Sequence, residues 1–311
     1  MTKEKNFAYY CDHWLATKST GLKASSCAKY RAELENHIKP FWGKLQLEEI
    51  TSEEMEKFIE ILLHEKNLSS RTTRNVLALF HMIFIYSGRR SEQKLSSLEI
   101  TYPKERRKVV RVLDEKEEET LIKLLAKEMK PDKFGIYLSL RTGMRIGEIC
   151  ALKWSDISFH AGTISVCRTV QRLKALDTKA RAKTELFIGP PKSDSSLRLI
   201  PLMPDMAALC AQFDPGIPEA FVLTGTEQCM EPRKLQRHLK KYTDACQLKE
   251  VHFHTLRHTF ATRCIEVGFD VKTLSEILGH SNIGVTLNQY VHPNMDLKRE
   301  NMSRLKAGIQ L

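Results

Sequence analysis

The strongest constraint in the sequence is a change of periodicity near residue 100. Before that point, apolar residues recur every three or four positions, as they do in helices that bury one face. Short loops separate four such segments, Phe7–Leu15, Ser25–Ile38, Glu53–His64 and Ser69–Gly88. The second segment is expected to stop before Pro40, because proline interrupts a helix. Residues 1–100 are therefore predicted to form a helical domain.

The periodicity is absent between residues 101 and 112. The stretch Tyr102-Pro-Lys-Glu-Arg-Arg-Lys108 is basic and contains a helix breaker. We predict an exposed linker between two domains. Its cations, which are also candidates for contacts with a polyanion, are Lys104, Arg106, Arg107 and Lys108.

Residues 113–295 are predicted to form a second, mixed domain. It opens with a capping-box pair, Asp114 and Glu117. Helices are expected at 115–127, 133–141 and 144–152, strands at 162–170, 185–189 and 197–202, and helices again at 241–246, 255–267, 271–278 and 285–291. The predicted fold class is mainly α with a small β-sheet (α+β). The tail, residues 296–311, has apolar residues at helical spacing, and packing on its own domain or docking onto a neighbouring protomer are both open.

The net charge narrows the kind of partner. The chain has 311 residues and a formal charge of +11, of which residues 1–110, with 19 basic and 14 acidic residues, contribute +5. A positive excess in both parts indicates a polyanion, with nucleic acid as the first candidate. The apolar runs are too short to span a bilayer, and Met1–Asn6 has no apolar core of a secretory signal, so no membrane partner is expected.

The cysteines indicate the compartment. All eight are scattered singly, without a CxxC pair or a framework spacing. This pattern argues against a zinc ribbon and favours the reducing cytoplasm, where cysteines act as small apolar residues.

Several basic residues can each be interpreted either as part of a functional site or as structural residues. Arg145 follows the turn Thr142-Gly143 at the start of a helix, where backbone N–H groups and a guanidinium can bind an anion together. Glu148 lies three residues further on the same face, so a surface ion pair is the simpler explanation of Arg145 taken alone. His254 and Arg257 share a helix face and suit a phosphate, whereas His254 and His258 have the spacing of a metal pair. An ordinary core or surface histidine is the third interpretation, and the simplest one for this motif taken alone. The zinc-protease pattern requires glutamate after the first histidine, and Thr255 stands there.

Three further residues are ambiguous when each is taken alone. Lys192 occupies a turn between two expected strands, where it is either solvated or a proton donor reaching into a cleft. His280 follows Gly279 at the entrance to the last helix. Tyr290 lies near the end of that helix, where a tyrosine commonly packs in the core.

Taken together and in order, these positions resemble a known family. Thr142-Gly-Met-Arg-Ile-Gly-Glu148, His254-Thr-Leu-Arg-His258, Leu278-Gly-His-Ser281 and Tyr290 are similar to the motifs of the tyrosine recombinases, which include phage and conjugative-transposon integrases and Xer-type resolvases. Lys192, followed by Arg198-Leu-Ile-Pro201, resembles the β-hairpin lysine of that family and its next strand. The resemblance covers residues 113–292 by motif and the N-terminal helices by pattern only.

The resemblance implies the chemistry of each residue. Tyr290 would attack a DNA phosphodiester and form a 3′-phosphotyrosine. Arg145 and Arg257 would hold the non-bridging oxygens, His280 would hydrogen-bond to the same phosphate, and Lys192 would protonate the leaving 5′-oxygen. His254 would assist proton transfer and phosphate placement, and Glu148 would orient the site through Arg145. No metal or cofactor is implied, and no Walker-type motif is present.

The resemblance also implies the partners. These are double-stranded DNA and further copies of the chain, as a tetramer on DNA, for integration or excision of a mobile element. Whether an excisionase or a DNA-bending protein takes part is open. A Xer-type resolvase and a DNA invertase share the same chemistry, and a type IB topoisomerase or a non-catalytic DNA-binding regulator are the more distant alternatives.

Overall fold

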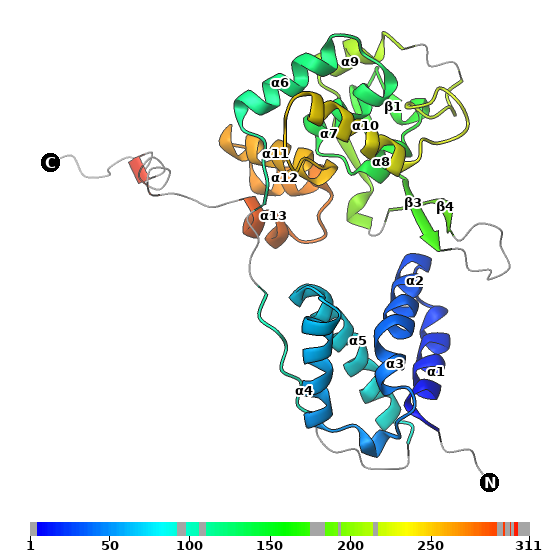
Figure 1. The fold of residues 1–311 in the computed structure, drawn as a ribbon. Helices are drawn as coiled ribbons and strands as arrows, with labels where there is room; N and C mark the ends of the chain where they lie inside the picture. The colour runs from blue at the N-terminus through cyan, green and yellow to red at the C-terminus, as the bar shows by residue number, and fades with distance from the viewer. Residues whose placement is uncertain are drawn as a thin grey trace, which may run out of the picture. The chain divides into compact units, whose positions relative to one another are not determined.

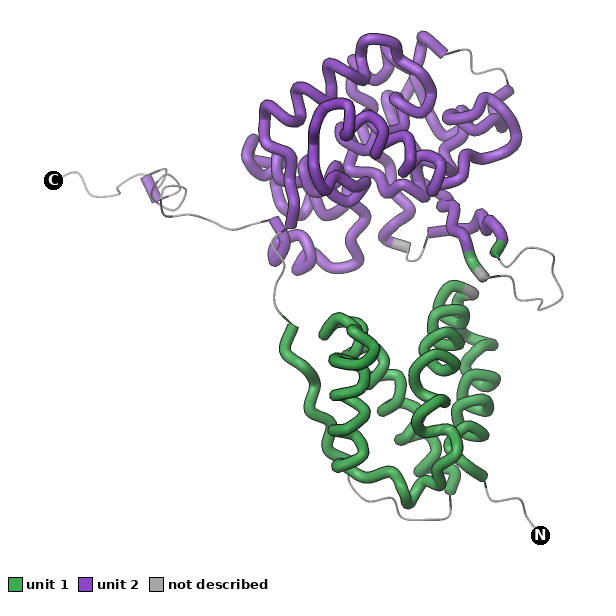
Figure 2. Tube along the Cα trace, viewed as in Figure 1, with its two compact units in different colours: residues 1–108, 173–184 green, residues 109–172, 185–311 purple. Residues whose placement is uncertain are grey.

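The structure is a computed structural model that describes residues 5–91, 98–105, 110–174, 184–191, 194–213 and 217–290, with Met295, Arg299, Met302 and Ser303. The chain separates into two compact units, residues 1–108 with 173–184 and residues 109–172 with 185–311 (Figure 2). Helices predominate and the strands are short (Figure 1), so the predicted class, mainly α with a small β-sheet, is confirmed.

Polar side chains cap three of the described helices of the first unit. Asn6, Thr51 and Ser69 each accept a hydrogen bond from the backbone N–H three residues on, which satisfies a free donor of the first turn. The helical elements are α1 (Phe7–Ser19), α2 (Ala24–Glu33), η1 (Leu34–Ile38), α3 (Lys39–Trp42), η2 (Leu47–Glu49), α4 (Ser52–Glu60), η3 (Ile61–Glu65) and α5 (Ser70–Gly88).

The expected helix end before Pro40 is wrong. The chain passes from α2 through the π-helical turn η1 directly into α3, and it stays helical up to Gly43. In η1 the Lys39 N–H donates to the carbonyl of Leu34, five residues back. Pro40 therefore falls in the first turn of a new helical segment, where its missing N–H costs little.

Aromatic rings fill the core of the first unit. Phe7, Trp42, Phe58 and Phe80 are at most 1% exposed. The Trp42 and Phe80 centroids lie 4.9 Å apart, and those of Phe7 and Phe80 lie 5.1 Å apart, within the range of favourable ring pairs. Tyr102, from the predicted linker, packs against this core.

Along the chain, the second unit has its strands between two groups of helices, while the strand-end residues Leu173, Lys174 and Thr184 are grouped with the first unit. Its elements are α6 (Glu115–Ala126), α7 (Pro131–Thr142), α8 (Ile146–Cys150), η4 (Trp154–Asp156), β1 (Ile157–Ser158), β2 (Thr163–Val166), β3 (Thr169–Lys174), β4 (Thr184–Gly189), η5 (Asp194–Ser196), β5 (Arg198–Pro201), α9 (Pro204–Cys210), α10 (Pro232–Ala245), α11 (Phe253–Glu266), α12 (Val271–Leu278) and α13 (Ile283–Tyr290). The sequence did not predict α9 or β1. Asp114 and Glu117 form the expected capping box of α6.

The sheet of the second unit has one buried face. Strand β2 lies between β1 and β5 and is antiparallel to both. Ile164 pairs with Ile157 on one side and with Ile200 on the other, and all three are at most 6% exposed. Strands β3 and β4 form a separate two-stranded sheet.

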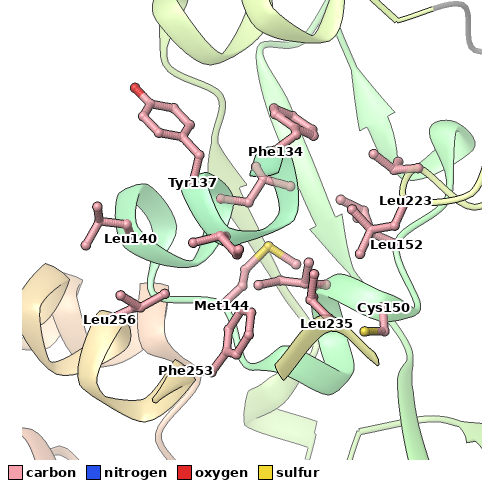
Figure 3. Packing of buried hydrophobic residues seen from close by; sticks show 14 of the residues in the cluster. Phe134, Tyr137, Leu140, Met144, Cys150, Leu152, Leu223, Leu235, Phe253 and Leu256 are labelled. Atoms are coloured by element: carbon pink, nitrogen blue, oxygen red, sulfur yellow. The ribbon is translucent and has the colours of Figure 1, made fainter. Parts of the chain in front are cut away.

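The main core of this unit connects the two helix groups. Met144 follows α7 and is fully buried, and Figure 3 shows it beside Leu235 of α10 and Phe253 of α11. These contacts fix the turn between α7 and α8 against α11. The turn and α11 carry the two candidate arginines, so the core determines their separation.

Some predictions fall outside the described residues. Arg106, Arg107, Lys108 and Lys192 are among them, as is most of the tail 296–311. Lys104 is described and exposed. In the part of the chain that the structure describes, no helix has both the length and the apolar character needed to cross a bilayer.

Candidate active site

Arg145 is positioned by the corner between α7 and α8. It is the N-cap residue of α8, and its backbone N–H donates to Glu148 Oε2 at 2.9 Å. Its guanidinium donates to Glu148 Oε1 at 2.8 Å and, through Nη2, to the carbonyl of Gly279 at 3.1 Å. The side chain keeps 34% of its surface exposed, so it can still meet a ligand. The ion pair expected from the three-residue spacing is thus present, and Arg145 can still bind an anion.

Glu148 also binds a second arginine, Arg198 of β5. Arg198 donates to both carboxylate oxygens, at 3.2 and 2.8 Å. Burial acts to raise the pKa of Glu148, but the hydrogen bonds and charge of Arg198 and the charge of Arg145 outweigh it. The pKa therefore lies below its ordinary value, and the carboxylate is ionised at neutral pH.

Arg257 is the most deeply placed cation of the site. It lies on α11 and is 4% exposed. Its Nη1 donates to the carbonyl of Gly143, and its Nη2 donates to the carbonyl of Leu278, both at 2.7 Å. Burial, followed by the charge of Arg145, lowers the pKa of Arg257 to about 9. It remains protonated at neutral pH.

His280 is held between Arg257 and α13. Arg257 Nη2 lies 2.9 Å from His280 Nε2, and since a guanidinium can only donate, Nε2 accepts. The imidazole proton is then on Nδ1, which donates to Thr286 Oγ1 at 2.7 Å. Burial and the charge of Arg257 lower the pKa of His280 to about 4, in agreement with a neutral ring.

Two glycines end helices and bind the two arginines reciprocally. Gly143 ends α7 with φ 65°, and Gly279 ends α12 with φ 66°, a conformation in which a side chain is strained. The Gly143 carbonyl accepts from Arg257, while the Gly279 carbonyl accepts from Arg145. A Cβ at Gly143 would lie 2.6 Å from the ring of Phe260. The motif glycines therefore place main-chain acceptors next to the cations.

Tyr290, the last residue of α13, is 9% exposed and packs with Leu274 and Leu278. Its hydroxyl lies 2.7 Å from Nδ1 of His258. Burial raises the pKa of Tyr290, while the charges of Arg257 and Arg145 act in the opposite direction. The phenol is protonated at neutral pH.

His254 lies at the margin of the site, one helical turn before His258. Its side chain is exposed, and its ring stands edge-on to that of His258 with 6.0 Å between centroids. Partial desolvation and the charges of Arg257 and Arg145 lower its pKa. The described residues contain no group of three or more residues able to hold a metal ion. His258, the other half of the possible metal pair, is engaged by Tyr290 instead.

A cavity of about 340 Å³ lies beside these groups. Arg145, Glu148, Gly279 and His280 line it. Pro191 lines it too, and the next residue, Lys192, is outside the described ranges. The surroundings carry three arginines against one ionised glutamate, so the site has a net positive charge next to a phenol. Such an arrangement can bind an oxyanion and present a nucleophile to it.

The sequence did not identify three residues of this site. Arg198 belongs to a quoted motif, and a cation between Leu197 and Leu199 in a short strand was a usable signal. Thr286 is four residues before Tyr290, on the same face of α13. His258 was considered only as a metal ligand. Their partners lie far away in the sequence, so no local pattern shows these contacts.

Comparison with protein families gives two matches. The family described as "Phage integrase family" matches residues 111–296, and "Phage integrase, N-terminal SAM-like domain" matches residues 6–63. A protein of Caldanaerobacter subterraneus subsp. tengcongensis named "Tyrosine recombinase XerC-like" is 26% identical over 294 residues, which is 87% of this chain and 74% of that protein. A "Tyrosine recombinase" of Thermosipho africanus is 27% identical over 296 residues, 92% of this chain and 93% of the relative.

Solved structures share the fold. The Tn1549 transposon integrase in complex with a circular intermediate DNA superposes with a TM-score of 0.79 at 20% identity, covering 97% of this chain and 99% of the integrase chain. The XerH site-specific recombinase bound to a palindromic difH substrate gives a TM-score of 0.68 at 17% identity, covering 98% and 97%. These likenesses establish that the two units have the architecture found in those proteins.

Proposed function

The chain belongs to the phage integrase family, whose members are tyrosine site-specific recombinases that break and rejoin DNA strands, and from this premise we propose that Tyr290 is its nucleophile. The phenolic oxygen attacks a DNA phosphodiester, forms a 3′-phosphotyrosine and releases a 5′-hydroxyl. The bond energy is kept in the covalent intermediate, so another strand's 5′-hydroxyl reverses the step without a nucleotide cofactor.

One observation supports this proposal above all. A buried tyrosine hydroxyl, two arginines and a histidine, from segments as far apart as Arg145 and Tyr290, meet beside a cavity with a net positive charge. A protein that only binds DNA has no need for a buried phenol next to an anion site. A structural tyrosine has no need for two guanidinium groups beside it.

We assign the phosphate to the arginines. Arg145 and Arg257 neutralise the non-bridging oxygens and stabilise the phosphorane-like transition state. Because Arg257 is fixed by two carbonyls, it needs little reorganisation when charge develops. His280 assists at the same phosphate. In this structure Nδ1 donates to Thr286 and the unprotonated Nε2 accepts from Arg257. The ring therefore donates to the phosphate after Arg257 turns to the phosphate and Nε2 takes up a proton.

The remaining assignments concern protons and orientation. Lys192 gives a proton to the leaving 5′-oxygen, and His254, at the exposed margin, assists phosphate placement. Glu148 orients Arg145 and Arg198 through its two oxygens. No metal and no cofactor is part of this assignment.

We propose that DNA binds to basic surfaces of both units. Helix α10 exposes cations over more than two turns, and a groove of about 950 Å³ lies along it. The exposed cations of α10 are Arg233, Lys234, Arg237, Lys240 and Lys241. In the linker, Lys104, Arg106, Arg107 and Lys108 add to these contacts. Since phosphate contacts release counterions, affinity falls steeply with salt.

We further propose the biological setting. The protein works in the cytoplasm as a tetramer on two duplexes, and the tail 296–311 docks onto a neighbouring protomer. An excisionase or DNA-bending protein sets the direction. The DNA sites are the ends of a mobile element, and Xer-type resolution is the alternative. The two differ in the partner site used, the element's own ends or a site of the chromosome, so sequencing the recombination products distinguishes them.

The covalent adduct tests the chemistry. The protein is incubated with nicked duplexes that contain the candidate site, and protein–DNA adducts are separated on denaturing gels. We expect an adduct with wild type and none with Tyr290→Phe, while both bind the DNA equally. A matched control is Tyr137→Phe, which removes the hydroxyl of another buried tyrosine, in this case one that donates a hydrogen bond to Asp205. Adduct formation by Tyr290→Phe, or its absence from wild type at every candidate site, would refute the proposal.

A further inference from the structure

The contact between Tyr290 and His258 belongs to none of the assigned roles. His258 lies on α11, directly after Arg257, and its Nδ1 is 2.7 Å from the hydroxyl of Tyr290 on α13. The tyrosine ring is fixed by the apolar cluster that also contains Ala261 and Cys264 of α11. The hydroxyl is therefore held toward the imidazole by packing as well as by the hydrogen bond.

The protonation states make this a donor–acceptor pair of defined direction. Burial, with the charges of His254 and Arg257, lowers the pKa of His258 to about 4. The pKa of Tyr290 is raised. At neutral pH the imidazole is neutral and the phenol keeps its proton, so the hydroxyl donates and Nδ1 accepts.

Attack by a phenol requires that its proton leave. Once the oxygen bonds to phosphorus, a retained proton would make it a strongly acidic oxonium, so a base has to take the proton during attack. Arg257, the other group in contact with the phenol, has no lone pair to accept it. His280 has its free lone pair engaged by Arg257. Among the described residues that contact the phenolic oxygen, His258 is the one with an available acceptor.

From this geometry, and resting on the proposed function of Tyr290, we propose that His258 is the general base of strand cleavage. The Tyr290 oxygen bonds to phosphorus while its proton moves to the lone pair of His258 Nδ1. The bond between phosphorus and the 5′-oxygen breaks, and that oxygen takes a proton from a separate acid. In rejoining, the imidazolium returns the proton to the phenolate as the phosphotyrosine bond breaks.

Binding of DNA favours this transfer. In the free protein, burial opposes a positive charge on His258 and on His280, and the charge of Arg257 acts in the same direction, so the pKa of both rings is lowered to about 4. A phosphate held by the arginines brings a negative charge that offsets theirs and raises the pKa of His258. The base therefore becomes competent when the substrate arrives, and the nucleophile stays protonated until then.

Two substitutions separate a base from a group that only positions the tyrosine. Asn at position 258 places an amide oxygen near the position of Nδ1, which accepts the hydrogen bond but cannot take the proton. Ala removes both functions. We expect His258→Asn and His258→Ala to slow adduct formation alike, by about 100-fold or more, with unchanged DNA affinity. Recovery of the wild-type rate by His258→Asn would overturn the proposal in favour of positioning. The matched control is His160→Asn, at an exposed turn.

The leaving group provides the second readout. Replacing the bridging 5′-oxygen by sulfur gives a thiolate leaving group that needs no proton. We expect the His258 variants to remain slow on this substrate, because the nucleophile still needs a base, whereas a Lys192→Ala variant recovers. Rescue of His258→Ala by sulfur would overturn the proposal, since it would place His258 at the leaving group. If wild type formed no adduct on either substrate, the nucleophile assignment itself would fail instead.

The pH profile provides the third readout. Without a base, attack depends on the free phenolate, so the rate of His258→Ala should rise about tenfold per pH unit above neutrality. Wild type should be much less steep there, because the base is already deprotonated. Parallel profiles for wild type and His258→Ala would overturn the assignment.

Discussion

Both units bury a glutamate, and the two carboxylates have opposite surroundings. Glu148, in the second unit, accepts hydrogen bonds from two arginines and has a lowered pKa. Glu33, in the first unit, has Lys29 at 3.6 Å, a raised pKa, and a buried Oε2 without a hydrogen-bond donor among the described residues. Desolvation acts on both, but only Glu148 has partners that outweigh it.

Two buried threonines show the same difference in hydrogen bonding between the units. Thr286 and Thr73 are both 0% exposed. Thr286 accepts a hydrogen bond from His280, whereas the hydroxyl of Thr73 has no partner within the described part of the chain. The first unit thus tolerates buried polar groups that have no hydrogen-bond partner. In the second unit, buried polar groups form a connected network at the candidate site.

The largest expected loss of stability comes from substituting Glu148, at the centre of that network. Glu148→Gln leaves Arg198 buried without its counter-charge, and loss of one partner of a buried pair costs about 3–5 kcal/mol. The free energy of opening of the second unit, measured by hydrogen exchange on the full chain, should fall by that amount. The first unit should be unaffected. A loss below about 1 kcal/mol would mean that the ion pairs contribute little, as at exposed sites.

Acidification should have the next largest effect, and in the second unit it should act through two histidines. The pKa of His258 and that of His280 are lowered to about 4 in the folded chain, against about 6.5 when unfolded. Between these values the unfolded state binds more protons, so stability is lost as pH falls from about 6.5 to 4. Above pH 6.5 the two rings are neutral in both states and contribute nothing.

Hydrogen exchange of α11–α13 as a function of pH measures this effect. Replacing His258 by Asn should make the slope shallower. An unchanged slope in that variant would contradict the assignment of the pH dependence to this ring.

A smaller loss of stability is expected when Thr286 is substituted, and Thr73 provides the comparison. Thr286→Val leaves the Nδ1–H of His280 without its acceptor, which costs about 1–3 kcal/mol. Thr73→Val removes a hydroxyl that has no partner and should be neutral or slightly stabilising. Thermal unfolding of the two variants compares them directly. Equal losses would show that the hydrogen bond to His280 has no special weight.

The smallest expected effect is a gain in the stability of the first unit. Glu33→Gln removes a buried charge whose pKa is raised by burial, so unfolding should become more costly by less than about 1 kcal/mol. The gain should disappear as pH falls toward the unfolded pKa of about 4.3, where wild-type Glu33 is also protonated. Destabilisation by this variant at pH 7 would show that the pair with Lys29 outweighs desolvation.

The comparison also explains what the sequence could predict. In the first unit, apolar spacing located the helices, because this signal acts within a few residues, and the caps Thr51 and Ser69 agree with it. The end before Pro40 was wrong because a π-helical turn absorbed the proline, and no local pattern announces such a turn. In the second unit the motif residues were found by their resemblance to the family.

The network around the motif residues could not be found in this way. Glu148 and Arg198 are 50 residues apart, and His258 and Tyr290 are 32 apart. Such contacts depend on how α11, α13 and β5 pack, which one sequence does not reveal. The spacing of His254 and His258 suggested a metal pair, but packing directs His258 toward α13.

The hydrogen bonds from Arg145 and Arg257 to the carbonyls of Gly279 and Gly143 affect how such a site can change during evolution. The atoms that hold Arg145 and Arg257 on those sides are carbonyl oxygens of the main chain. Every amino acid supplies the same oxygen, so mutations of surrounding side chains leave these acceptors in place as long as the backbone keeps its course. The two glycines and two arginines are therefore the positions at which a substitution would disturb these hydrogen bonds most directly.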